Sequence, residues 1–246
     1  MHETESFFDN QAEGWSKLYD EDSRFRRRFE RIARLIERVL PSSPARVLDA
    51  GCGAGVFSRF LASRGYNVTA FDASPEMIER AREISSSSAP TPIEGGGWGV
   101  VEFQNSTIEN FDSPAESFDA ILSLSMLEYV DDDEAAIEKF HRLLKKDGIL
   151  IVSVPNRRGI LRKIEGVVFG IRTVSRDKIF AGRGEYLKFQ KRQYSPFELD
   201  ILMRLHGLKK VRSIYLNGGI ANPEWLLPFF ERRWWAAMYC GVYRKK

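Results

Sequence analysis

A glycine-rich turn between a short strand and a helix is the feature that most constrains the fold of this 246-residue chain. Arg46 to Leu48 reads as a strand, Asp49-Ala50-Gly51-Cys52-Gly53-Ala54-Gly55 follows it, and a helical pattern then runs to Gly65. A strand, a glycine turn and a helix in this order begin a βαβ unit. Because glycine has no Cβ, backbone N–H groups and the helix N-terminus can approach a ligand closely. The turn therefore predicts a site for a nucleotide-like cofactor.

Strands and helices continue to alternate after this turn. One helix follows Ser74-Pro75-Glu76, and another carries Ile137, Phe140 and Leu144. The apolar runs around these helices are typical of strands that are buried on both faces. The expected strands are Asn67 to Phe71, Val100 to Phe103, Phe118 to Leu124 and Ile149 to Val154. This alternation predicts an α/β fold, a parallel sheet with helices on both faces.

Further elements are expected toward the two ends of the chain. Apolar residues recur at intervals of three and four between Ser23 and Leu40, which predicts an amphipathic helix ended by Pro41. Ser195 to Glu198 matches a capping box, and the helix that it begins should end near Gly207. Two late strands are expected at Leu208 to Leu216 and Trp235 to Tyr243, and a loop at Ser85 to Gly99.

Composition is ordinary for one globular domain over residues 1–246. The chain has a formal charge of +3 and 43% hydrophobic residues, enough for a single large core. Cys52 and Cys240 lie far apart, which suits neither a disulfide framework nor a metal site. No apolar run approaches the roughly 18 residues of a membrane-spanning helix, and the acidic N-terminus is unlike a secretory signal. We therefore expect a cytoplasmic protein that binds no metal.

An aspartate ends the second expected strand. The carboxylate of Asp72 can accept hydrogen bonds from both hydroxyls of a ribose, each worth roughly 1.5–3 kcal/mol. NAD and S-adenosyl-L-methionine both carry such a ribose, so an NAD-dependent oxidoreductase remains an alternative. The dinucleotide fingerprint, however, requires a small residue three positions after Gly53, where this chain has Val56. The spacing therefore disfavours NAD.

Five successive motifs resemble those of the class I S-adenosylmethionine-dependent methyltransferases. They are Val47 to Gly55, Phe71 to Met77, Ser117 to Asp119, Leu127 to Val130 and Leu143 to Gly148. The resemblance covers residues 7–155 well and the remainder loosely. It implies a Rossmann-like, seven-stranded, mostly parallel sheet whose last strand is antiparallel, with residues 1–40 as a helical cover.

The resemblance also implies which residues bind S-adenosyl-L-methionine. Gly51 and Gly53 would line its methionine part, Asp72 its ribose and Met77 its adenine, with Ser106 to Glu109 at the adenine edge. The full set of expected cofactor-binding residues is Tyr19, Asp49, Gly51, Gly53, Asp72, Ala73, Met77, Thr107, Ile108 and Ser123. The aromatic residues of the cover, Phe8, Trp15 and Tyr19, are expected to close over the cofactor.

Among subfamilies the chain most resembles the quinone-biosynthesis O-methyltransferases, through residues 106–111, residues 125–130 and Asn156-Arg157. Relatives that methylate catechol-like rings have Glu in place of Ser125 and His in place of Tyr129, and only Glu128 is kept. This departure disfavours a metal-assisted reaction. It also leaves open the alternative that the protein binds the cofactor without catalysing a reaction and serves as a partner subunit.

The expected catalytic residues are Glu128 and Tyr129, because a hydroxyl acceptor must lose its proton and both residues follow the fourth strand. Glu128 could instead cap the helix that starts near Asp132. The histidines, His2, His141 and His206, have sufficient structural explanations and are not expected to act as bases.

A basic segment follows the fifth strand. Residues 157–193 contain eleven lysines and arginines against three acidic residues, around the apolar string Gly166 to Ile171. Basic and large apolar residues together suit an anionic membrane surface, where each cation contributes about 1 kcal/mol. We expect residues 157–206 to form a lid-like insertion and helix that admits a hydrophobic or prenylated small molecule. The alternatives are a solvated basic face over an ordinary pocket and, less favoured without any RNA-binding motif, a nucleic-acid surface.

Overall fold

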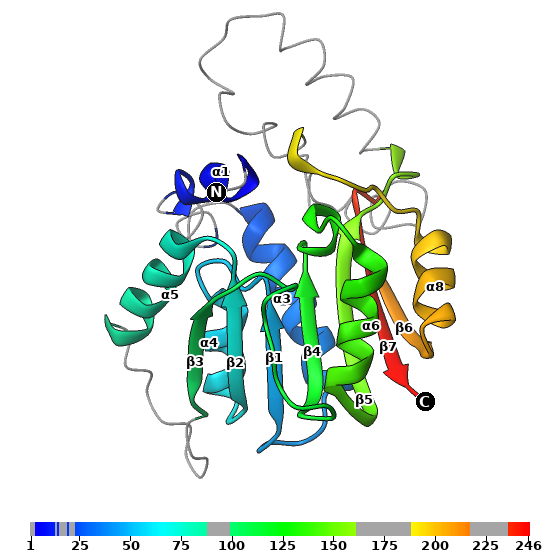
Figure 1. Cartoon of the computed structure of the whole chain (residues 1–246), viewed down its shortest axis with the longest axis horizontal. Coiled ribbons are helices and arrows are strands. Elements are labelled where there is room, and N and C mark those ends of the chain that lie inside the picture. The colour runs from blue at the N-terminus through cyan, green and yellow to red at the C-terminus, as the bar shows by residue number, and fades with distance from the viewer. Residues whose placement is uncertain are drawn as a thin grey trace, which may run out of the picture.

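Seven strands form one sheet in the order β3-β2-β1-β4-β5-β7-β6 (Figure 1). The computed structural model describes residues 3–12, 14, 19, 23–87, 99–160, 188–216 and 236–246. The strands are β1 (Arg46–Ala50), β2 (Asn67–Asp72), β3 (Val101–Asn105), β4 (Phe118–Leu124), β5 (Leu144–Pro155), β6 (Leu208–Leu216) and β7 (Met238–Lys245). The first five pair in parallel, and β7 is antiparallel to both of its neighbours. The predicted Rossmann-like sheet with an antiparallel last strand is therefore confirmed.

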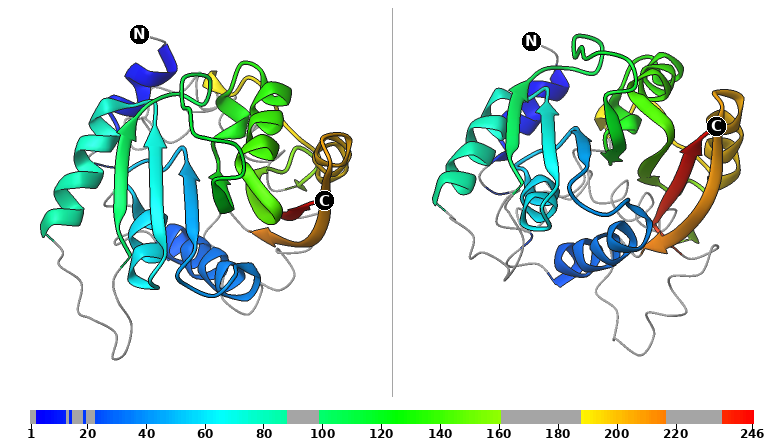
Figure 2. Two further views of the ribbon diagram at one scale, coloured as in Figure 1. Left: turned by 60° about the horizontal axis from the view of Figure 1, so that its bottom comes forward. Right: turned by 90° about the horizontal axis from the view of Figure 1, so that it is seen from below.

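Helices cover both faces of the sheet. The helices are α1 (Glu3–Asp9), α3 (Ser23–Val39), α4 (Val56–Ser63), α5 (Pro75–Ser87), α6 (Asp133–Leu143) and α8 (Pro196–Leu205), with the 3-10 turn η1 (Leu127–Tyr129). One core cluster joins α3, α4 and α5 to the sheet, and the other joins α6 and α8 to it. Figures 1 and 2 show α6 and α3 on opposite sides of the sheet. Within the described ranges, no helix is long and apolar enough to cross a membrane.

The strand order creates a crevice beside β1. The chain moves from β1 through β2 to β3 on one side, whereas β4 and β5 lie on the other side of β1. Where the direction of strand addition reverses, the loops after neighbouring strands separate, and open α/β sheets bind their ligands there. The glycine turn follows β1, so the topology places it in this crevice.

The caps of two helices agree with the sequence patterns. The Ser195 hydroxyl accepts the N–H of Glu198 at 3.3 Å, and the Glu198 carboxylate accepts the N–H of Ser195 at 2.8 Å, which is the predicted capping box of α8. For α6 the capping side chain is that of Asp132, which accepts the N–H of Ala135 at 2.9 Å. The suggestion that Glu128 caps this helix is therefore wrong.

Several predicted boundaries shift. Residues 85–87 continue α5 and are not part of a loop, because the hydroxyls of Ser86 and Ser87 donate to carbonyls three residues back and so accommodate a helical serine run. Leu144 starts β5 by pairing with Phe118, and does not end the preceding helix. The described last strand is Met238–Lys245, while Trp235 lies outside the described residues.

Candidate cofactor and acceptor site

A cavity of about 550 Å³ opens at the carboxyl ends of β1, β2 and β4. Nine of the ten expected cofactor-binding residues line it: Tyr19, Asp49, Gly51, Gly53, Asp72, Ala73, Met77, Thr107 and Ile108. Of the two expected catalytic residues, Tyr129 lines the cavity. Segments that are far apart in the chain thus meet at one end of the sheet, the end above which α1 lies in Figure 1.

The glycine turn supplies the floor of the cavity. Gly51, Gly53 and Gly55 all have positive φ, of 70°, 52° and 72°. A Cβ on Gly51 would lie 2.6 Å from Cγ of Met126, so glycine is required there for packing. A Cβ on Gly53 would meet nothing closer than Sδ of Met77 at 4.0 Å. The backbone at Gly53 therefore borders open space in which a ligand can approach it.

The carboxylate of Asp72 joins the two turns that follow β1 and β2. One of its oxygens accepts the N–H of Gly53 at 2.8 Å, and the other accepts the N–H of Ser74 at 3.0 Å. Burial raises the pKa of Asp72, and these two backbone hydrogen bonds oppose that shift. Each oxygen retains a lone pair, so the arrangement fits the two hydroxyls of a ribose.

A second carboxyl group, that of the buried Asp49, lies in the same cavity. It accepts the Ser58 hydroxyl at 2.6 Å. Burial and, to a smaller extent, the nearby charge of Asp72 raise the pKa of Asp49 to about 6, although the Ser58 hydrogen bond lowers it. Two carboxyl groups that are both poorly solvated favour a cationic ligand. The ammonium and sulfonium charges of S-adenosyl-L-methionine fit this pair.

The substitution Asp49→Asn is expected to stabilise the ligand-free protein above about pH 6. The pKa of Asp49 is about 6 in the folded protein against an ordinary 3.8, so its contribution to stability is present below about pH 4 and is lost as the pH rises through about 6. The melting temperature of the variant should exceed that of the wild type by a few degrees at about pH 8, and the two should converge near about pH 4. Thermal melts across this range test this; parallel curves for the two proteins would contradict it.

Apolar side chains line the cavity together with Asp72. Met77 and Ile108 are buried, and the side-chain amide of Asn105 donates to the carbonyls of Asp72 and Ala73 at 3.0 Å each, which ties the end of β3 to the turn after β2. Apolar side chains of this kind fit the faces of a purine base, in agreement with the expected placement of adenine.

The N-terminal helix α1 contributes to the roof. Phe8 packs near Ala54 and Met77, and its ring lies 5.3 Å from that of Tyr129 in an edge-to-face arrangement. The Ser74 hydroxyl donates to Asp9 at 2.6 Å, which joins α1 to the start of α5. Tyr19 also lines the cavity, whereas Trp15 lies outside the described residues.

Two expected site residues do not line the cavity. The side chain of Ser123 is fully buried within β4, and its hydroxyl has no hydrogen-bond partner in the described part of the chain. Glu128 is 1% exposed, and its backbone carbonyl accepts the N–H of Lys191 at 2.8 Å. For both residues the burial favours a structural role, and their assignment to cofactor binding and catalysis stays a prediction.

Among the lining residues that the sequence analysis did not assign to the site are three with polar side chains, Arg28, Ser125 and Lys191. The Arg28 guanidinium donates to the hydroxyls of Ser125 at 2.9 Å and Ser153 at 3.4 Å, and it forms no ion pair with any described residue. Ser125 has a φ of 60°, a conformation that is uncommon for a residue other than glycine. Arg28 is the last of three consecutive arginines, and only its position on α3 could have identified it as the one that lines the cavity.

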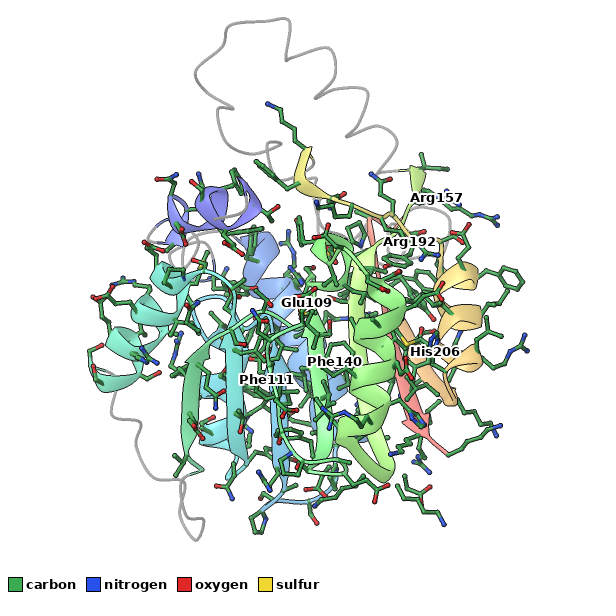
Figure 3. The ribbon with its side chains drawn as sticks, viewed as in Figure 1. Glu109, Phe111, Phe140, Arg157, Arg192 and His206 are labelled. Atoms are coloured by element: carbon green, nitrogen blue, oxygen red, sulfur yellow. The ribbon has the colours of Figure 1, made fainter. Side chains whose placement is uncertain are left out.

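The two described histidines lie away from the cavity. A Cβ on Gly207 would lie 3.0 Å from Nε2 of His141, so the turn after α8 packs on α6. Figure 3 shows His206 on the α8 side of the molecule. Neither His141 nor His206 lines the cavity.

Sequence comparison finds a family model and named relatives. The model described as "Methyltransferase domain" matches residues 24–213. The ubiquinone biosynthesis O-methyltransferase of Xylella fastidiosa (strain 9a5c) is 35% identical over 178 residues, which are 70% of this chain and 64% of that protein. The protein of the same name from Cereibacter sphaeroides (strain ATCC 17025) is 30% identical over 186 residues, 75% of this chain and 67% of that protein. The match thus spans slightly less than two thirds of the Xylella protein's length.

Solved structures share the fold at low sequence identity. The N-methyltransferase NodS from Bradyrhizobium japonicum, in complex with S-adenosyl-L-homocysteine, has a TM-score of 0.65 at 17% identity, covering 99% of both chains. A 1,6-didemethyltoxoflavin-N1-methyltransferase from Burkholderia thailandensis, also with S-adenosylhomocysteine, has a TM-score of 0.62 at 19% identity, covering 98% of this chain and 87% of that one. At these identities the likeness concerns the architecture alone.

Proposed function

The chain belongs to the S-adenosylmethionine-dependent methyltransferases, and from this premise we propose that it methylates an oxygen of a hydrophobic small-molecule acceptor. The observation that carries the proposal is the shared cavity, which is lined by the buried Asp49, the half-buried Asp72, the glycine turn, several apolar side chains and Tyr129. The relatives named as ubiquinone biosynthesis O-methyltransferases support oxygen as the acceptor atom.

Each part of the cavity has a proposed role in holding the cofactor. Asp72 binds the ribose hydroxyls, Asp49 lies toward the ammonium group, and the backbone at Gly51 and Gly53 borders the methionine part. Arg28 binds the carboxylate, because it is a cation in the cavity wall that hydrogen-bonds only hydroxyls within the described residues.

When bound, S-adenosyl-L-methionine supplies an electrophilic methyl group on a positively charged sulfur. The chain's task is to exclude water and to align the acceptor, and alignment alone can lower the barrier by about 7–11 kcal/mol. Phe8, Met126 and Tyr129 form the acceptor side of the cavity. The Tyr129 hydroxyl is the nearest candidate to exchange a proton with the acceptor, and Glu128 is the second candidate, from behind the cavity wall.

Incubation with methyl-labelled cofactor and a bacterial lipid and small-molecule extract tests the proposal. We expect a labelled, base-stable O-methyl product that mass analysis identifies, and no product from heat-denatured protein. Tight binding of S-adenosylhomocysteine without any labelled product would favour the alternative of a non-catalytic partner subunit. The observation that supports this alternative is that Ser125 and Tyr129 stand where relatives that methylate catechol-like rings have Glu and His. Calorimetric binding of NADH alone would instead favour an oxidoreductase.

The substitution Arg28→Met is expected to weaken S-adenosylhomocysteine binding by about 10- to 30-fold, because a charge-assisted pair with the cofactor carboxylate is lost. The binding of 5′-methylthioadenosine, which has no carboxylate, should stay at the wild-type level. Arg34→Met is the matched control, since Arg34 lies on the same helix with its side chain 61% exposed and paired to Glu30. Equal losses for both ligands in isothermal titration would contradict the assignment.

The basic segment supports a proposed peripheral membrane contact. The structure describes its two ends: Arg157 pairs with Glu198, and Arg192 contacts both oxygens of Asp133 at 2.9 and 2.8 Å. Residues 161–187, which carry six of its eleven lysines and arginines and all three of its acidic residues, lie outside the described residues. An anionic surface near the cavity would allow a cytoplasmic enzyme to take a prenylated acceptor directly from the membrane.

Vesicle co-sedimentation tests this contact. A variant with glutamine at Arg162, Lys163, Arg172, Arg176, Lys178 and Arg183 should pellet less than the wild type with vesicles containing phosphatidylglycerol. Glutamine at Lys209 and Arg212, two exposed cations on β6, is the control and should leave pelleting unchanged. If all three proteins pellet alike, residues 157–193 form a solvated face and not a membrane contact.

A further inference from the structure

One lysine makes an unusual set of contacts beside the cavity. The ammonium of Lys139, on α6, donates to the backbone carbonyls of Ile108 at 2.7 Å, Glu109 at 2.8 Å and Phe111 at 3.0 Å. An ammonium group has three N–H donors, so these carbonyls use its full capacity. Phe111 of this loop and Phe140 of α6 belong to the same core cluster, and Figure 3 labels both of them together with Glu109.

No carboxylate of a described residue pairs with this ammonium. Among the described residues, Lys145, Lys191, Lys210 and Lys245 each pair with an acidic side chain, whereas Lys139 pairs with none. Lys139 is half-buried, so its charge is satisfied by the oriented carbonyl dipoles of a single loop. Its contacts therefore act on the conformation of that loop's backbone.

The loop is a single helical turn that does not continue into a helix. The N–H of Phe111 donates to the carbonyl of Thr107 at 2.8 Å, and the next carbonyls lack the following turn that would satisfy them. The Lys139 ammonium takes the place of that missing turn. On the core side, Phe111 stacks on Phe71 with ring centroids 4.7 Å apart.

The opposite side of the same loop borders the cavity. Thr107, Ile108, Glu109 and Asn110 all line it, next to Asp72 and Met77. Lys139 itself does not line the cavity. A change at Lys139 therefore reaches a bound ligand only through the position of these four residues.

We propose that Lys139 is a positioning residue that holds residues 107–110 where they contact the edge of the cofactor's adenine, and that it thereby sets selectivity for this base. The inference rests on the proposed binding of an adenosyl cofactor. Recognition of a base edge requires donors and acceptors that are held within about 0.5 Å of their productive positions. A surface loop meets this requirement only when other residues fix its backbone.

Titration of wild type, Lys139→Met and Lys145→Met with S-adenosylhomocysteine and S-inosylhomocysteine tests the proposal. The two ligands differ only at the base edge. For Lys139→Met we expect S-adenosylhomocysteine binding to weaken by about 5- to 20-fold and S-inosylhomocysteine binding to change little, so that the preference for adenine falls. Lys145→Met is the matched control, because Lys145 pairs with Asp119 away from the cavity; both affinities should be those of the wild type.

The outcomes separate this inference from the function on which it rests. A lower melting temperature for Lys139→Met with unchanged affinity for both ligands would show a merely structural lysine and overturn the inference. Failure of the wild type to bind S-adenosylhomocysteine would overturn the proposed function first. If Lys139→Met does not fold, Lys139→Arg takes its place, because it retains the charge but not the three converging donors. This variant should show the same loss of preference for adenine to a smaller degree. An unchanged preference in Lys139→Arg would also count against the inference.

Discussion

Asp72→Asn is expected to weaken the binding of S-adenosylhomocysteine by about 100-fold or more, because two charge-assisted hydrogen bonds to the ribose are lost, each worth roughly 1.5–3 kcal/mol. The substitution also places an amide N–H₂ group opposite the N–H of Gly53 or of Ser74, both of which now donate to the carboxylate. Two donors would then face each other, so the turns after β1 and β2 would lose their common acceptor.

Asp119→Asn is the matched control for this prediction. Asp119 also bridges two elements, since it accepts the N–H of Arg46 at 2.9 Å and the ammonium of Lys145 at 2.7 Å, but it does not line the cavity. Its variant should bind S-adenosylhomocysteine as the wild type does. Calorimetry on the three proteins decides the matter: affinity of Asp72→Asn within about threefold of the wild type would remove Asp72 from the cofactor site.

Alanine at Gly51 and at Gly53 should produce opposite kinds of damage. At Gly51 the new methyl group would lie 2.6 Å from Cγ of Met126, in addition to the strain of a φ of 70°. Left-handed strain of about 1–2 kcal/mol and overpacking of about 1–3 kcal/mol predict a fall in melting temperature of roughly 5–15 °C. At Gly53 the methyl group meets no atom closer than 4.0 Å, so only the strain remains and the fall should be about a third as large.

The loss of ligand affinity should be larger for Gly53→Ala than for Gly51→Ala, which is the reverse of the order expected for the loss of stability. The methyl group of Gly53→Ala would lie in the open space where the methionine part of the cofactor is proposed to bind, so its affinity for S-adenosylhomocysteine should fall by at least about 10-fold below the melting temperature. Each variant is the control for the other. Equal melting temperatures together with wild-type affinity for Gly53→Ala would contradict this account of the turn.

The placement of Ser123 shows what family resemblance and strand pattern can and cannot predict about a site residue. The resemblance implied that Ser123 contacts the cofactor, and the sequence correctly placed it on β4. Ser123 and Ser125 are two positions apart, so strand alternation alone would place their side chains on the same face. Ser123 lies inside β4 and is fully buried, whereas Ser125 lies just beyond the end of the strand. Here Ser125 reaches the cavity, through a left-handed backbone conformation that no sequence pattern signals.

Glu128 and Tyr129 show the same difficulty within a 3-10 turn. Both follow β4, and both were reasonable candidates for proton transfer. In three residues of η1 the chain turns Tyr129 toward Phe8 and buries Glu128. Which of the two enters the cavity depends on how η1 packs against the segment at Lys191, some sixty residues later in the chain.

Local sequence patterns were sufficient to predict the order of strands and helices along the chain, the glycine turn and the acidic residue at the end of β2. These features depend on hydrophobic periodicity, caps and turn geometry, which are set by residues within a few positions of one another. The Asp49–Ser58 hydrogen bond, between residues nine positions apart, lies within the predicted strand, turn and helix.

Three-dimensional packing is needed to see that Arg28 contacts Ser125, 97 residues away, and that Lys139 contacts a loop 31 residues before it. Arginines and lysines are frequent on helix surfaces, and their long side chains give no periodic signal of a particular partner. Such contacts exist because the strand order reverses beside β1 and brings the ends of α3, β4 and the loop after β3 to one cavity, a juxtaposition that no local pattern specifies.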